Sequence, residues 1–266
     1  MNRKANDTRD NELSFFGFRT GPSGAHSART MMLAELSTLL DSITPNESHD
    51  QLVNDVVEYN VLNKPTAKAR QLTVRHLTDL YALDPSVPIY RVFRTLWSTE
   101  EQGRPILALL LALARDHILQ NSENFIVGLP IGKTITREDT EQELRRIYGE
   151  RLSASSIRSY AQNINGTWTQ AGYLKGRIKK TRQRLQATPA SLAYALFLAY
   201  LEGATGERLF SSSWAKLLDQ SDDRLHELAQ LASLRGLLVY RRSGGVTEVR
   251  FPDYLTPEEL KELPHE

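Results

Sequence analysis

The residues best suited to chemistry in this sequence are cations gathered in one short stretch, where their charge would attract a polyanion. Residues 151–201 contain no Asp or Glu, although the chain of 266 residues has 32 of them. Six of the eight Lys and Arg residues in that window fall within residues 175–184, while the whole chain has a net charge of only +1. Because nucleic acid presents a dense row of phosphates, this local positive field favours nucleic-acid binding. The alternative is a solvated basic face that balances acidic surface elsewhere.

The same window has the pattern of an amphipathic helix followed by a basic hairpin. Apolar side chains over residues 153–170 recur at helical spacing, as Ile157, Tyr160 and Trp168 do. The opposite face has small or hydrogen-bonding side chains and no carboxylate, which suits contacts with base edges and phosphates. The predicted DNA-binding residues are Ser155, Ser156, Arg158, Ser159, Gln162 and Asn163 on the helix, and Lys175, Arg177, Lys179, Lys180, Arg182 and Arg184 on the hairpin.

A second helix must precede this one for the pair to act as a DNA-binding module. Residues 137–148 predict such a helix, with Thr136 as its N-cap and Gly149 at its end. Helix, turn, second helix, strand and basic hairpin is the layout of a winged helix-turn-helix. The second helix of that module enters the major groove and the wing contacts phosphates. An ordinary surface helix is the alternative, but the lack of carboxylates favours DNA because an acid would repel phosphates.

A similar layout follows toward the C-terminus. Its presumptive recognition helix, the last helix before the hairpin, carries Asp222, Asp223 and Glu227, which favours a structural or protein-binding role. Arg241 and Arg242 on its hairpin keep DNA binding as the alternative, and both belong to the predicted DNA-binding set. The elements predicted here are helices over 191–201, 211–218 and 221–235, and strands over 237–242 and 246–251 around the turn Ser243-Gly244-Gly245.

The first half of the chain predicts helices alone. Apolar residues recur at helical spacing over 27–42, after Ser48, between Pro65 and Tyr81, and near 90–97. Residues 106–114 are entirely apolar, but nine residues fall well short of the roughly 20 that span a membrane, so they predict a buried helix. The fold class is therefore mainly α, a NusB-like helical bundle followed by two winged-helix-like modules with short β-hairpins. The predicted parts are a flexible arm (1–26), the bundle (27–130), the first winged helix (131–188), the second (189–255) and a tail helix (256–266).

No constellation in the sequence predicts catalysis, a metal site or a cofactor. Residues 128–134 resemble a phosphate-binding loop but have three residues between the glycines instead of four, so we interpret them as a linker. The six His residues are scattered, and the chain has no Cys. Residues 1–10 lack an apolar core, so we expect no secretory signal and a cytoplasmic protein. Trp97, Trp168 and Trp214 lie on apolar helical faces and are predicted to be core residues rather than base-stacking platforms.

Three short motifs remain. They are Ser27-x-Arg29 followed by Glu35, the run Asn60-Val61-Leu62-Asn63-Lys64 with the helix containing Arg75 and Leu77 after it, and the stretch 153–174, a helix with an N-terminal serine cluster and a Gly-hydrophobic-Leu exit. These motifs resemble the BrxA family of BREX (bacteriophage exclusion) defence systems. The resemblance covers about residues 27–200 and implies a NusB-like helical protein that binds DNA within a multi-protein phage-defence complex.

Together these patterns predict a non-enzymatic protein that binds double-stranded DNA and acts with other components of a phage-defence complex, with no membrane association. Two alternatives stay open. The winged helices could bind protein as an adaptor or assembly factor, or a NusB-like bundle could bind RNA.

Overall fold

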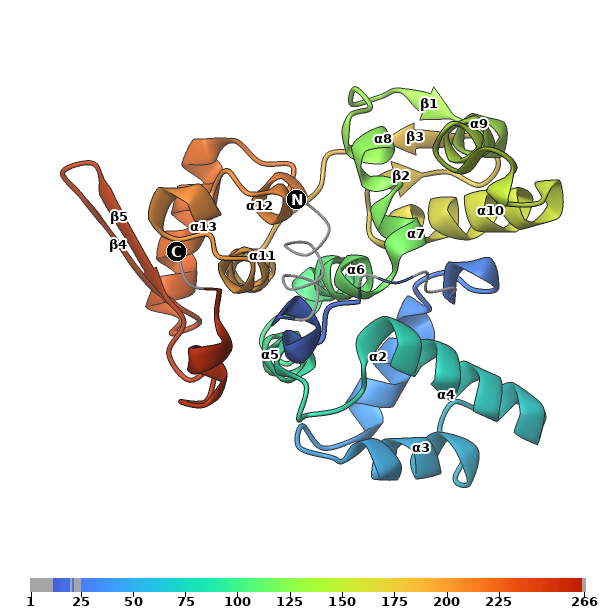
Figure 1. Ribbon diagram of the computed structural model, residues 1–266, viewed down its shortest axis with the longest axis horizontal. Coiled ribbons are helices and arrows are strands. Elements are labelled where there is room, and N and C mark those ends of the chain that lie inside the picture. The colour runs from blue at the N-terminus through green and yellow to red at the C-terminus, as the bar shows by residue number, and fades with distance from the viewer. Residues whose placement is uncertain (1–11, 20, 22–24, 265–266) are drawn as a thin grey trace, which may run out of the picture. The chain divides into compact units, whose positions relative to one another are not determined.

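The structure is a computed structural model that describes residues 12–19, 21 and 25–264. The described chain is mainly α-helical with two small antiparallel sheets (Figure 1). It forms two compact units. Of the described residues, 12–19, 87–110 and 185–264 form the first unit, and 21, 25–86 and 111–184 form the second. None of the helices within the described ranges is long and apolar enough to cross a membrane.

Helices α2 (Leu33–Ser42), α3 (His49–Val57) and α4 (Ala67–Tyr81) open the second unit. A helix follows Ser48, as the sequence predicted, and Ser48 caps it through a capping box with Gln51. The helix predicted over 27–42 starts only at Leu33. A 3₁₀ turn, η1 (Ala25–Ser27), comes first, and Met32 then takes a left-handed conformation with φ 53°. Helix formation fails over residues 28–32 because this stretch packs against a later helix, α10, and bonds to it.

The chain of the second unit continues through the last part of α6 (Arg104–Arg115), α7 (His117–Gln120) and α8 (Glu123–Val127). Asp116 separates α6 from α7 and caps the latter by accepting from the amides of Ile118 and Leu119. The apolar run 106–114 is buried throughout, as predicted.

The rest of the second unit builds a small sheet beside two helices. Strand β1 (Thr134–Ile135) leads into α9 (Arg137–Tyr148) and α10 (Ala154–Gln170), and the hairpin of β2 (Leu174–Lys175) and β3 (Lys180–Arg182) follows (Figure 1). The strand order is β1-β3-β2, all antiparallel, with Thr134 opposite Thr181 and Leu174 opposite Arg182. Strand β1 was missed, since two residues are too short for any periodicity.

The first unit combines α5 (Pro88–Trp97) with α11 (Pro189–Leu201), α12 (Ser213–Lys216) and α13 (Asp222–Leu234). Helix α5 packs on α11, where the Tyr194 hydroxyl donates to the carbonyl of Ile89 at 3.0 Å and the ring lies against Phe93. The stretch 27–130, predicted as one bundle, therefore contributes to both units. The domain boundaries themselves stay predictions.

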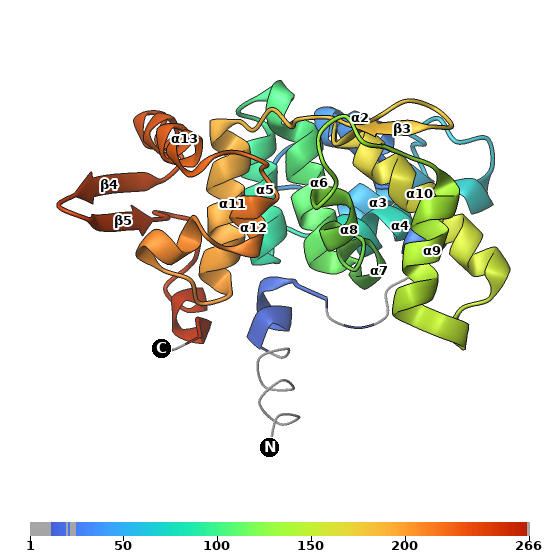
Figure 2. The ribbon, with the colours of Figure 1, turned by 90° about the horizontal axis from the view of Figure 1, so that it is seen from above.

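A two-stranded ribbon completes the first unit. Strands β4 (Val239–Ser243) and β5 (Val246–Arg250) are joined by Gly244 and Gly245, whose φ values of 58° and 83° fit a tight hairpin turn (Figure 2). Beyond it, where a tail helix was predicted, Thr256 and Glu259 form a capping box, but the helix that follows is a short 3₁₀ turn, η5 (Glu259–Glu262).

The predicted N-terminal arm falls partly outside the described residues, which omit 1–11, 20 and 22–24. Within the described part, residues 12–16 are helical. Phe16 and Phe18 are buried, with Phe18 edge-on to Trp214 at 6.1 Å, whereas Phe15 stays about half exposed. Phe16 and Phe18 therefore dock this segment within the first unit.

Candidate nucleic-acid interface

Most of the predicted DNA-contacting cations of the second unit lie on its surface without a neutralising acid. Arg158 projects from α10, and Lys175, Arg177, Lys179 and Arg184 from the hairpin, and all five side chains are exposed. None forms an ion pair with any residue that the structure describes. Ser155, Ser159 and Gln162 are exposed on the same helix as Arg158, and Ser156 is half-buried. The charge of these cations is therefore free to act on a ligand.

Helix α10 and the β2–β3 hairpin share a cleft, which we call the basic cleft. It has a volume of about 360 Å³. Its walls are Arg137 and Glu138 of α9, Gln162 and Asn165 of α10, and Arg177, Ile178 and Lys180 of the hairpin. The fold thus brings together three predicted residues that are up to 18 positions apart in sequence, Gln162, Arg177 and Lys180. Glu138 is the acid of this cleft, and Arg137 neutralises it through an ion pair of 2.7 Å.

The hairpin has a defined shape. Lys180 donates to the Thr169 hydroxyl at 2.8 Å and to the carbonyl of Gly176 at 3.2 Å, which ties the hairpin to α10 and closes the turn. Partial burial lowers the pKa of Lys180. Gly176 has φ 124°, and a side chain there would collide with the carbonyl oxygen of Lys179. The cations on the turn are consequently presented by a fixed backbone.

Arg182 was predicted to contact phosphates, but the structure buries it. Its side chain is 0% exposed, and its guanidinium lies 4.5 Å from the centre of the Tyr173 ring. It also donates to the carbonyl of Gln183. Alternation along β3 explains this, since neighbouring side chains of a strand face opposite sides. Arg182 holds the sheet together and is not available to a phosphate.

Asn163 was also predicted to face DNA, yet it is directed into the second unit. Its side-chain amide donates to the carbonyl of His26 at 2.8 Å, and the residue is half-buried. Helical spacing places Asn163 at the edge of the polar face, where the chain around η1 covers it.

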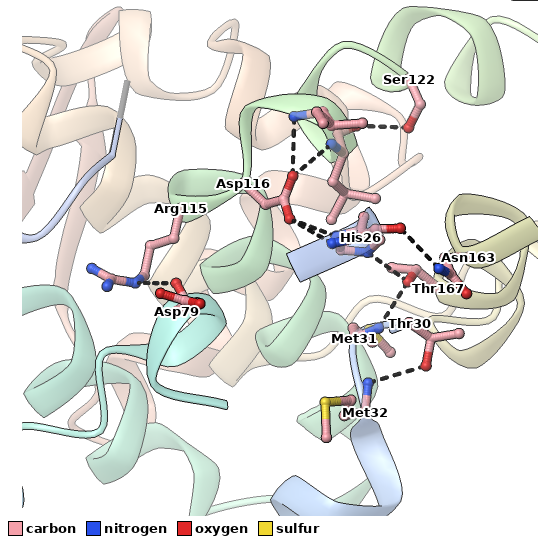
Figure 3. A network of polar contacts seen from close by, with 12 residues as sticks. His26, Thr30, Met31, Met32, Asp79, Arg115, Asp116, Ser122, Asn163 and Thr167 are labelled. Carbon is pink, nitrogen blue, oxygen red and sulfur yellow. Dashed lines mark hydrogen bonds and ion pairs between the residues drawn. The ribbon is translucent and has the colours of Figure 1, made fainter. Parts of the chain in front are cut away.

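A buried polar network holds α10 in place (Figure 3). His26 bonds through Nδ1 to Asp116 Oδ2 at 2.7 Å and through Nε2 to Thr167 Oγ1 at 2.8 Å. The amide of Met31 donates to the same hydroxyl at 2.9 Å. A side chain at Gly166 would lie 2.6 Å from the methyl of Thr30, so α10 approaches this segment closely. The network therefore joins η1, α7 and α10, and it fixes the helix that carries the polar face.

Asp, His and a hydroxyl in this order have the geometry of a hydrolytic triad, but their burial assigns them a structural role. His26 and Thr167 are 0% exposed and Asp116 is 1% exposed. Burial acts to raise the pKa of Asp116, yet hydrogen bonds from the His26 ring and from the amides of Leu119 and His26 together outweigh it and hold the pKa below its ordinary value. A carboxylate that is kept ionised in this way stabilises the unit at neutral pH.

The hairpin of the first unit presents a different electrostatic surface. Glu248 lies opposite Arg241 on the ribbon and forms ion pairs with it at 3.9 Å and with Arg250 at 2.9 Å. The cleft beside this hairpin has a volume of about 580 Å³. Its walls are Asp223, His226, Glu227 and Gln230 of α13 and Tyr240 and Arg242 of the hairpin. Arg241 and Arg242 are exposed as predicted, but they lie among acids.

Sequence reasoning missed several residues of the basic cleft and its surroundings. Lys133 is exposed, and its carbonyl accepts from the Arg182 amide, so it extends the sheet that bears the hairpin. Arg137 and Ile178 line the cleft itself. Lys133 was missed because residues 128–134 were interpreted as a linker, and nothing in their composition indicates a strand. No signal links His26, Asp116 and Thr167, which are far apart in sequence.

No protein-family model matches this chain, and a search of curated proteins finds none with significant similarity to it.

Proposed function

We propose that the chain is a non-enzymatic protein that binds double-stranded DNA through α10 and the β2–β3 hairpin. The element order supports a winged helix-turn-helix: β1, α9, α10, β2 and β3, with β1 pairing to β3. In this arrangement α10 would lie in the major groove and the hairpin would contact the backbone. The order of α11, α12, α13, β4 and β5 supports a second module of the same kind, and the helices before residue 130 are proposed to be NusB-like.

The observation that carries the proposal is the set of exposed cations without acidic partners around the basic cleft. An acid that pairs with a cation cancels much of the cation's electrostatic field. Helix α9 illustrates this, because its Arg137, Arg145 and Arg146 pair with acids of their own helix. The cations on α10 and the hairpin keep their field, and phosphate is the ligand that such a surface attracts.

We further propose that the protein acts with other components of a phage-defence complex of the BREX type, as its resemblance to the BrxA family implies. Two motif residues of that resemblance, Glu35 and Lys64, form an ion pair of 3.0 Å. Asn60 clamps the backbone of Lys64 by accepting from its amide at 2.8 Å and donating to its carbonyl at 3.1 Å. These residues therefore shape the turn after α3.

Fluorescence anisotropy with a labelled random-sequence duplex of about 20 base pairs tests the DNA proposal. The five exposed cations predict a log–log slope of affinity against salt of about −4 to −5. Unlabelled duplex RNA of the same sequence, added as a competitor, should displace the DNA poorly. The absence of binding at 50 mM salt would overturn the proposal, and equal competition would favour the RNA alternative.

A protein adaptor is the second candidate, and the acids on α13 favour it. Asp223 and Glu227 line the cleft of the first unit and would repel phosphates but attract a basic segment of a partner. An adaptor without DNA binding predicts no anisotropy change with any duplex. It also predicts that a partner captured by the protein is lost when Asp223 and Glu227 are replaced by Asn and Gln.

A further inference from the structure

The tip of the β2–β3 hairpin carries an apolar side chain that the fold does not use. Ile178 is 83% exposed and lies in the turn between the two strands. A β-branched residue is a poor choice for a turn, where Gly, Asn and Asp dominate, and its exposure adds no burial that would stabilise the unit. Because an exposed isoleucine in this turn does not help the hairpin to fold, its presence points to a role in recognition.

The neighbours of Ile178 indicate which partner it meets. Arg177 and Lys179 flank it, both are exposed, and neither pairs with an acid among the described residues. Ile178 also lines the basic cleft together with Gln162 of α10, so it faces the same side as the polar surface of that helix. An apolar side chain between two cations fits a groove that is bordered by phosphates and has an apolar floor of base edges.

We propose that Ile178 enters the minor groove of duplex DNA while α10 occupies the adjacent major groove. The affinity for DNA then depends on which base pairs form the floor of that minor groove. Apolar wedges of this kind contact or partly unstack base steps in the minor groove, with phosphates held by flanking cations. The guanine amino group projects into that groove, so G·C pairs obstruct the side chain and A·T pairs admit it. This inference rests on the proposed DNA binding, and the test below separates the two.

The test uses the full chain and three duplexes of equal length: alternating dA·dT, dG·dC and dI·dC. An I·C pair has the major-groove edge of G·C without the minor-groove amino group, so it isolates the minor groove. The wild-type protein should bind dI·dC and dA·dT about tenfold more tightly than dG·dC, as expected for burying one large aliphatic side chain. Ile178→Ser should bind dI·dC and dG·dC with equal affinity, whereas Ile178→Val should keep the preference.

Val246 provides a matched control, because it is a β-branched residue near the tip of the β4–β5 hairpin and is 71% exposed. Val246→Ser should leave the preference unchanged. If Ile178→Ser retains the wild-type preference, the groove assignment is overturned while DNA binding stands. If the wild type binds none of the duplexes, the proposed function itself fails. If Ile178→Ser binds every duplex as wild type does but loses a captured protein, the tip is a protein-docking site.

Discussion

The β2–β3 hairpin of the second unit and the β4–β5 hairpin of the first unit are both rich in cations, but in the β4–β5 hairpin an acid of the same ribbon, Glu248, pairs with two of them. Lys175, Arg177 and Lys179 have no ion pair within the described chain. On the other ribbon, Glu248 pairs with both Arg241 and Arg250. Residues 174–182 carry five Lys and Arg residues and residues 239–250 carry three, and ion pairing widens this difference in the field that reaches a ligand.

The helices beside the two hairpins differ in the same direction. The exposed face of α10 offers Ser155, Arg158 and Gln162, while that of α13 offers Asp223 and Glu227. The exposed surfaces of α10 and α13, each beside a hairpin, thus differ in charge, in line with the proposed division between DNA and protein partners. Each of the following predictions weakens or strengthens that comparison.

The largest effect is expected at the buried histidine of the second unit, His26, and His226 of the first unit is its comparison. His26→Ala leaves the buried Asp116 carboxylate without its partner, which should lower the free energy of unfolding by about 3–5 kcal/mol. His226 bonds to Tyr240 and to the more exposed Glu207, so His226→Ala should cost only about 1 kcal/mol. Urea unfolding followed by circular dichroism measures both. Equal losses would contradict the view that the His26 network is the tighter one.

The next largest effect is expected from removing the cations of the β2–β3 hairpin that have no ion pair among the described residues. Replacing Lys175, Arg177, Lys179 and Arg184 together by Ala should weaken duplex binding about 100-fold at 0.1 M salt and reduce the salt slope by about 3–4. The matched variant replaces Arg241, Arg242 and Arg250 by Ala and should reduce the slope by less than about 1, because two of these arginines are already paired. A larger effect from the second variant would reverse the assignment of the two hairpins.

A substitution of Arg182 tests whether this cation serves packing or binds phosphate. Arg182→Leu removes the contact with the Tyr173 ring and should destabilise the protein by about 2 kcal/mol. The salt slope of DNA binding should stay at its wild-type value, because this guanidinium is buried. Thermal unfolding and anisotropy give the two readings, and a reduced slope in a folded variant would return Arg182 to the binding surface.

Low pH should lower the stability of the second unit through protonation of Asp116. The folded-state pKa of this carboxyl is lowered, so its stabilisation is present above the unfolded-state pKa of about 4 and is lost as the pH falls through the folded value. The unfolding temperature should therefore decrease steeply below about pH 4. Asp116→Asn should flatten this decrease, and an unchanged profile in that variant would show that other carboxyls cause it.

The smallest effect is expected from freeing the paired arginines. Glu248→Gln removes the acid between Arg241 and Arg250 and should steepen the salt slope of DNA binding by up to about 2. A slope equal to that of the wild type would show that ion pairing is not what distinguishes the two hairpins.

Local patterns predicted most of the helices and several of their ends. Thr136 is the N-cap of α9 and Gly149 follows its last residue, both as expected. The three Trp residues were correctly predicted to be core residues. These predictions succeed because capping and helical periodicity depend on residues within a few positions of one another.

Predictions failed where distant contacts decide. The residues before Leu33 leave the helical conformation because Met31 and His26 bond to Thr167, more than 130 positions away. The cation–π contact of Arg182 and the β1–β3 pairing likewise require the assembled sheet.

For the candidate site, the sequence by itself determined where the positive charge is concentrated and that acids are absent from it. Only the tertiary structure decided which cations reach solvent, that Asn163 faces inward, and that Ile178 joins the basic cleft. The physical reason is that charge is a property of each residue, while exposure and partners arise from segments that the chain brings together only when it folds.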